Sequence, residues 1–134
     1  MNTTIKSGVL GGIAGGAVFG MLMQMMGVMP MIATMVGSES VVVGWLLHLI
    51  ISAVTGALFV VTLGKNVTSY GKGIGMGVVY GMIWWVLGAL IIMPVILGMG
   101  VQFANAFDQM RMMSLMGHAI FGAILGAVVV MQTR

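Results

Sequence analysis

Four stretches of about 20 residues contain no aspartate, glutamate, lysine or arginine, and they make up most of the chain. They cover residues 8–29, 41–63, 73–93 and 112–131. At a rise of about 1.5 Å per residue, each is long enough as a helix to cross a hydrocarbon core of about 30 Å. Their apolar residues run continuously, whereas the strands of a membrane barrel alternate in segments of about ten residues. Backbone groups in lipid must be satisfied within the segment, so we expect four transmembrane helices.

The composition agrees with a membrane protein and excludes a soluble globular domain. Of 134 residues, 60% are hydrophobic and 5% are charged, whereas a soluble chain carries roughly a quarter charged residues. We therefore expect a single transmembrane domain over residues 1–134. The absence of cysteine excludes disulfides, thiolate metal sites and cysteine nucleophiles. The net charge of +3 is small and scattered, so it does not indicate a nucleic-acid partner.

The basic residues lie mainly on one side of the predicted bundle. Four spans place both termini on the same side, together with Lys6, Lys65, Lys72 and Arg134. The opposite side holds a single arginine and both acidic residues. Because loops rich in lysine and arginine stay on the cytoplasmic side, both termini are expected to be cytoplasmic.

The chain reads as two copies of one helical pair, over about residues 8–63 and 73–132. In the first span of each copy, glycines recur every four residues and a Met-Pro pair follows: Gly12, Gly16, Gly20 and Met29-Pro30, then Gly73, Gly77, Gly81 and Met93-Pro94. In the second span of each copy, a histidine lies eight residues before a glycine: His48 and Gly56, then His118 and Gly126. These glycine triplets are offset by 61 residues and the histidines by 70. The predicted fold is an all-α integral membrane four-helix bundle built from two tandem two-helix repeats, related by an axis along the membrane normal.

Small residues at four-residue intervals predict close helix packing, because lipid provides no hydrophobic drive between helices. The 22 glycines exceed what four helices need to pack against one another. Besides the lipid bilayer, we therefore expect a partner: a second copy of the chain or another subunit of a membrane complex.

His48 and His118 are the ionisable residues within the predicted spans. The duplication gives them equivalent positions, about seven residues inside the outer end of their helices. Ionisable groups within a membrane are costly and face protein or water. One interpretation is that each neutral imidazole holds helices together through a hydrogen bond. The other is that the two rings form a site in the outer half of the bilayer.

The residues four positions from each histidine lie on the same helix face and are small: Gly44, Ser52, Ser114 and Gly122. If the second and fourth spans face each other, both imidazoles could ligate one haem b iron, with a planar ring beside the small residues. Alternatively, the pair could bind a smaller ion, because neutral imidazole suits copper and zinc, and thioether is a soft ligand that favours Cu(I). Thirteen of the 17 methionines lie in the predicted outer half or outer loops.

Other chemistries lack the residues that they need. No carboxylate lies within a span to relay protons. The glycines between residues 71 and 77 match neither phosphate-binding loop motif. We therefore do not expect an enzyme.

Three strings resemble small four-span membrane proteins of bacteria: Gly44-Trp45-Leu46-Leu47-His48, Trp84-Trp85-Val86-Leu87-Gly88 followed by Met93-Pro94, and Ser114-Leu115-Met116-Gly117-His118. The resemblance covers nearly the whole chain and carries no activity with it. It implies a bacterial inner membrane as the location.

Two functions follow from these features. The first is a multi-pass inner-membrane protein whose His48 and His118 bind haem b or copper, for electron transfer or metal handling. The second is a structural or assembly subunit, or a small oligomeric pore, without a cofactor.

Overall fold

The computed structural model describes residues 3–133, which form helices and turns without a strand. This confirms the all-α prediction. The helices in chain order are α1 (Ile5–Met26), α2 (Met29–Ala33), η1 (Thr34–Val36), α3 (Val41–Leu63), η2 (Gly64–Asn66), α4 (Tyr70–Trp84), η3 (Trp85–Ile92), α5 (Met93–Ile96), η4 (Phe103–Asn105) and α6 (Gln109–Thr133).

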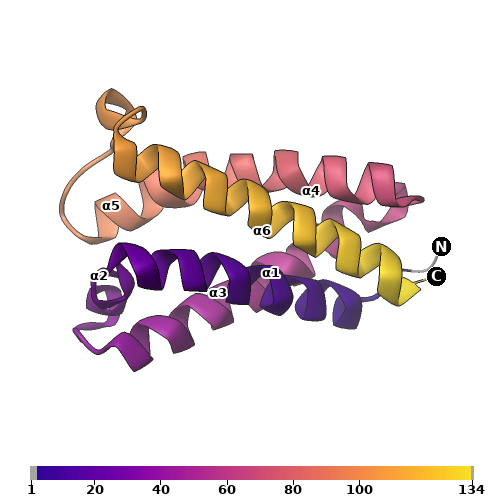
Figure 1. Cartoon of the computed structure of the whole chain (residues 1–134), viewed down its shortest axis with the longest axis horizontal. Coiled ribbons are helices and arrows are strands. Elements are labelled where there is room, and N and C mark those ends of the chain that lie inside the picture. Colours follow the sequence, from indigo (N-terminus) through magenta and orange to yellow (C-terminus); the bar gives the residue numbers. More distant parts are fainter. Residues whose placement is uncertain (1–2, 134) are drawn as a thin grey trace.

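Four helical stretches are long and apolar enough to cross a membrane, as expected of a multi-pass membrane protein. They are Ile5–Met26, Val41–Asn66, Tyr70–Ile96 and Gln109–Thr133, and each contains most or all of one charge-free stretch of the sequence. Helix α1 begins and helix α6 ends at the same end of the molecule (Figure 1). Helices α2 and α5 lie at the opposite end, which is called the distal end below.

Small polar residues and glycine set the helix ends. The hydroxyl of Thr4 accepts a hydrogen bond from the backbone N–H of Ser7, and the Ser7 hydroxyl accepts one from the backbone N–H of Thr4, both at 3.2 Å. Ser40 and Ser69 cap α3 and α4 in a similar way through their hydroxyl groups. These caps satisfy amide groups that the first turn of a helix leaves without partners. Gly27 ends α1 with a φ of 73°, a left-handed conformation that glycine adopts without strain.

The four long helices form two pairs, α1 with α3 and α4 with α6, as Figure 1 shows in its lower and upper halves. The pairs are joined through α1 and α6, which pack closely along their length. Helices α3 and α4 touch only slightly. Helix α1 therefore has two large neighbours, and the bundle is closed on the α1–α6 side and more open on the α3–α4 side.

Within each pair, glycines bring the backbones of two helices into direct contact. A Cβ atom on Gly8 would overlap the backbone of Gly56, and one on Gly73 would lie 2.8 Å from the carbonyl oxygen of Gly126. By these contacts Gly73 corresponds to Gly8, 65 residues earlier, whereas the 61-residue offset matches Gly73 with Gly12. The predicted alignment of the two copies is thus shifted by one helical turn. The tandem repeat itself stays a prediction.

Helix α1 uses its glycines on two faces, one for each neighbour. Those that meet α3 are Gly8, Gly12, Gly16 and Gly20, and those that meet α6 are Gly11 and Gly15. Packing inside one chain thus accounts for all six. The glycines of α1 therefore give no reason to expect a second copy of the chain or another subunit against this helix.

The sequence predicts one continuous α-helix for the third span. The structure differs, because α4 continues into the π-helical segment η3. Pro94 has no backbone N–H, so it cannot bond the carbonyl of Leu90, four residues earlier, as an α-helix would require. The backbone N–H of Gln102 donates to this carbonyl at 2.8 Å instead. The loop that follows α5 is thereby held against η3.

Candidate functional site

A cavity of about 400 Å³ lies between the two helix pairs in the distal half of the molecule. Its walls come from α1, α3, α6, the α4–η3 helix and the segments around both Met-Pro pairs. Most of the lining is apolar. The polar side chains in the wall are His48, Ser52, Thr55, Arg111, Ser114 and His118. His48 and His118 therefore border one cavity, and the sequence prediction that they form a site stays a prediction.

His48 is buried, with 7% of its surface exposed. Its Nε2 lies 2.8 Å from the carbonyl oxygen of Gly16 on α1. Because a carbonyl only accepts hydrogen bonds, Nε2 carries the proton and donates it, and Nδ1 keeps a free lone pair. The hydroxyl of Ser52 donates to the carbonyl of His48 at 2.7 Å. The ring is thus fixed in one tautomer and in one orientation.

His118 is half-buried and is fixed in the opposite tautomer. Its Nδ1 lies 2.8 Å from the carbonyl oxygen of Ser114, one turn earlier on α6. By the same reasoning Nδ1–H donates and Nε2 keeps its lone pair. Each imidazole in the cavity wall therefore has one ring nitrogen bonded to the backbone and one that is an electron-pair donor.

The helices that carry the two rings do not pack directly against each other, so the condition that the second and fourth spans face each other closely is not met. Helices α3 and α6 share no substantial contact, because α1 packs between them. Phe19 on α1 makes edge contacts with both imidazoles, with ring centroids 5.5 Å from His48 and 4.6 Å from His118. The imidazole centroids are consequently at most about 10 Å apart. No motif in the sequence indicated that Phe19 would contact both histidines.

The small residues beside the histidines do not leave room for a flat ring in the way that the sequence suggests. Gly44 and Gly122 lie directly against the backbone of neighbouring helices, so the space that a side chain would take is filled. Ser52 and Ser114 do line the cavity. The helix faces that carry the histidines are thus used for close packing as well as for the cavity.

Methionines line much of the cavity, and all of them belong to the outer group that the sequence singled out. They are Met23, Met26, Met31, Met35, Met93, Met99 and Met110. They come from five parts of the chain: α1, the region of α2 and η1, α5, the loop after it, and the start of α6. Tertiary structure thus gathers thioether groups around the space that the two imidazoles border.

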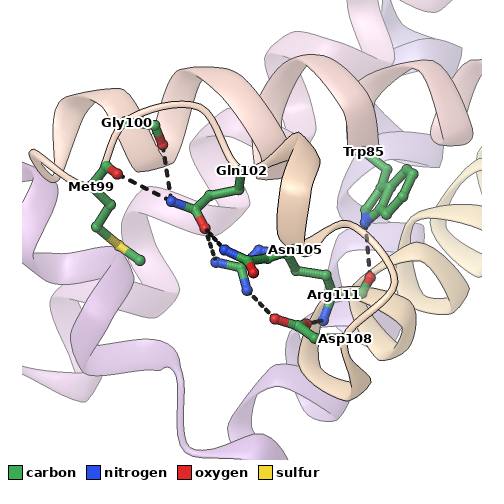
Figure 2. A network of polar contacts seen from close by, with 7 residues as sticks. All are labelled: Trp85, Met99, Gly100, Gln102, Asn105, Asp108 and Arg111. Atoms are coloured by element: carbon green, nitrogen blue, oxygen red, sulfur yellow. Dashed lines mark hydrogen bonds and ion pairs between the residues drawn. The ribbon is translucent and has the colours of Figure 1, made fainter.

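A polar cluster closes the distal end of the molecule around the side chain of Gln102 (Figure 2). Its amide nitrogen donates to the carbonyls of Met99 and Gly100 at 3.1 and 3.2 Å. Its amide oxygen accepts from Asn105 at 3.0 Å and from the guanidinium of Arg111 at 2.9 Å. Gln102 therefore joins the loop after α5 to the start of α6.

Arg111 has further partners in this cluster. Its guanidinium forms an ion pair with Asp108, and its backbone N–H donates to the same carboxylate at 2.8 Å. The indole N–H of Trp85 donates to the carbonyl of Arg111 at 2.9 Å. The sequence prediction treated Arg111 as a loop charge only. The spacing of Gln102, Asn105, Asp108 and Arg111 by three residues was the available indication of a joint role.

No group of three or more histidine, aspartate or glutamate side chains that could hold a metal lies together within residues 3–133. A site in this cavity therefore has two imidazoles, thioethers and hydroxyl groups as its available donors. Comparison with family models, with curated proteins and with solved structures finds no match.

Proposed function

We propose that this is a multi-pass membrane protein that binds a soft monovalent metal ion, Cu(I), between His48 and His118, and that its role is metal handling. The four apolar helices support the membrane location. The charge asymmetry of the loops and the resemblance to bacterial four-span proteins support an inner membrane with both termini cytoplasmic.

The hydrogen bonds of the two histidines support a metal ligand role. Each ring donates one N–H to a backbone carbonyl. Such a bond fixes the tautomer and orients the other nitrogen, and it accompanies most histidines that ligate metals. A lone pair directed from a rigid ring suits a Lewis acid.

The methionines favour Cu(I) as the bound metal. Seven thioether side chains line the same cavity as the imidazole pair, and thioether and imidazole together favour Cu(I) over hard cations. This shared lining is the observation that carries the proposal. A haem b group fits less well. Gly44 and Gly122, beside the two histidines, lie directly against the backbone of neighbouring helices and leave no space for a planar ring.

The competing function is a structural subunit in which the histidines only join helices. The bond from His48 to Gly16 favours it, because that bond links α3 to α1 without any ligand. In a membrane such a bond stabilises by about 1 kcal/mol, which is sufficient reason for a buried histidine.

Titration of the purified protein in detergent with Ag⁺ separates the two functions, because Ag⁺ is a soft monovalent cation that air does not oxidise. We expect one Ag⁺ per chain, and at least tenfold weaker binding in His48→Gln and in His118→Gln. The glutamine amide retains a donor for the backbone carbonyl. Met82→Leu serves as the control, because Met82 is exposed on α4 and does not line the cavity.

Three other outcomes have clear meanings. Equal Ag⁺ binding by the wild type and both glutamine variants would refute the proposed site. The absence of Ag⁺ binding would leave the structural subunit. A Soret absorption band after reconstitution with haem, lost in His48→Gln, would replace copper by haem b.

The proposed topology has its own test. The chain has no cysteine, so single introduced cysteines report their side of the membrane without background. In intact cells, an impermeant maleimide is expected to label Phe107→Cys and to leave Ser69→Cys unlabelled. The reverse pattern would invert the topology.

A further inference from the structure

Of the residues that the structure describes, Arg111 is the one charged residue that lines the cavity. Its side chain is only 17% exposed. On α6 it lies seven residues before His118, which is a helix rise of about 10 Å. The guanidinium contacts Asp108, which is further from His118 along α6, so a positive charge is fixed somewhat more than two helical turns from this imidazole.

The polar cluster at the distal end holds this charge in place. The guanidinium is bonded to the amide oxygen of Gln102 at 2.9 Å and to the carboxylate of Asp108. The carboxylate does not line the cavity, and the Asp108 side chain is 43% exposed. Water therefore screens the negative charge of the pair more than the positive one, and the cavity experiences a net positive potential.

We infer that Arg111 makes the proposed site selective for monovalent over divalent cations. The inference rests on the proposed function and adds a determinant of specificity to it. Repulsion from a fixed charge is proportional to the charge of the bound ion. At an effective dielectric constant of about 20 and a separation of about 12 Å, it weakens binding roughly tenfold for each unit of charge.

The two classes of cation are thereby treated differently. For a soft monovalent ion, the thioether and imidazole donors offset the loss of affinity caused by this repulsion. A divalent ion such as Zn²⁺ can use the same imidazoles but is repelled twice as strongly. Arg111 thus compensates for the fact that imidazole nitrogen alone does not distinguish Cu(I) from Zn²⁺.

The test compares the dissociation constants of Ag⁺ and Zn²⁺ in the full-length protein and in Arg111→Gln. The glutamine removes the charge and keeps a hydrogen-bonding side chain. We expect the ratio of the two constants to shift about tenfold in favour of Zn²⁺. Arg111→Met is the second charge-free variant, in case the glutamine disturbs the fold.

Two further variants separate charge from loop anchoring. Arg111→Lys keeps the charge but cannot contact Gln102 and Asp108 at the same time as the guanidinium does. It is expected to keep the wild-type ratio of the Ag⁺ and Zn²⁺ dissociation constants. Asp108→Asn breaks the ion pair and leaves the positive charge uncompensated, so it is expected to shift the ratio further toward Ag⁺.

The outcomes are distinguishable. Ag⁺ binding with a ratio unchanged within twofold in both charge-free variants would overturn this inference and leave the proposed function standing. A shift in Arg111→Lys equal to that in Arg111→Gln would also overturn it, because geometry rather than charge would then be responsible. Failure of the wild type to bind Ag⁺ would overturn the proposed function, and the inference with it.

Discussion

Gly77 and Gly75 lie on the same helix, α4, two residues apart, and they offer a matched test of backbone packing. A Cβ atom on Gly77 would overlap the carbonyl oxygen of Gly122 on α6 and would lie 2.8 Å from its carbonyl carbon. A Cβ atom on Gly75 would meet no atom within 4 Å. The same substitution, glycine to alanine, therefore has opposite expected effects at the two positions.

The magnitudes follow from helix propensity and from packing. Alanine stabilises a helix by about 1 kcal/mol relative to glycine, so Gly75→Ala is expected to be more stable by up to that amount. At Gly77 the same gain is outweighed, because overpacking costs about 1–3 kcal/mol and backbone atoms cannot rotate away. With the cost at its upper end, Gly77→Ala is expected to be less stable by about 2 kcal/mol. The two variants then differ by about 3 kcal/mol, or roughly 100-fold in the folding constant.

Reversible unfolding in mixed micelles with increasing sodium dodecyl sulfate measures these differences. Helix content by circular dichroism reports the transition for the wild type and both variants. Gly122→Ala is expected to resemble Gly77→Ala, because its Cβ would overlap the Gly77 carbonyl in return. If Gly77→Ala proves as stable as Gly75→Ala, then α4 and α6 do not approach through these glycines and the argument for the packing of this pair is wrong.

Three further predictions concern the seam between α3 and α4, the cavity and the distal loop. The Tyr80 hydroxyl donates to the carbonyl of Thr55 across that seam at 2.5 Å. The free energy of unfolding of Tyr80→Phe is therefore expected to be about 1 kcal/mol lower than that of the wild type. An unchanged free energy would mean that the bond does not stabilise the contact between α3 and α4. Gly88 lines the cavity, and a Cβ atom on it would meet no atom within 4 Å. Gly88→Leu is therefore expected to fill part of the cavity and weaken Ag⁺ binding at least tenfold, with little change in stability. Unaltered binding would mean that the metal binds elsewhere. The backbone N–H of Arg111, with its guanidinium, holds the pKa of Asp108 below its usual range. The stabilisation from Asp108 is therefore fully present above about pH 4 and lost as the pH falls through the lowered pKa, so the wild type is expected to lose thermal stability toward pH 2 relative to Asp108→Asn, and parallel curves would contradict this.

The sequence by itself determined the four long helical spans. Charge-free stretches of about 20 residues demand helices wherever lipid is the solvent, and this demand is local to each stretch. Gly27 ends α1 for an equally local reason, because glycine adopts the left-handed conformation without strain. Close packing of helices was also predictable from glycines spaced four residues apart.

The candidate site was only partly predictable. The matching depth of His48 and His118 follows from their positions in the sequence, and both line one cavity. Which helix lies between them does not follow, because small residues every four positions are present on all four spans. The choice depends on which glycine faces meet, and α1 has two such faces. That is why α1 contacts both the second and the fourth span, and why Phe19 contacts both rings.

The position of Arg111 was decided by tertiary structure alone. Its place in the cavity wall depends on the Gln102 cluster, and Gln102 is anchored by the Leu90 carbonyl that Pro94 leaves free. Each of these contacts joins residues from different segments of the chain. Local patterns specify which backbone groups lack partners, but only the folded chain decides which distant residue supplies them.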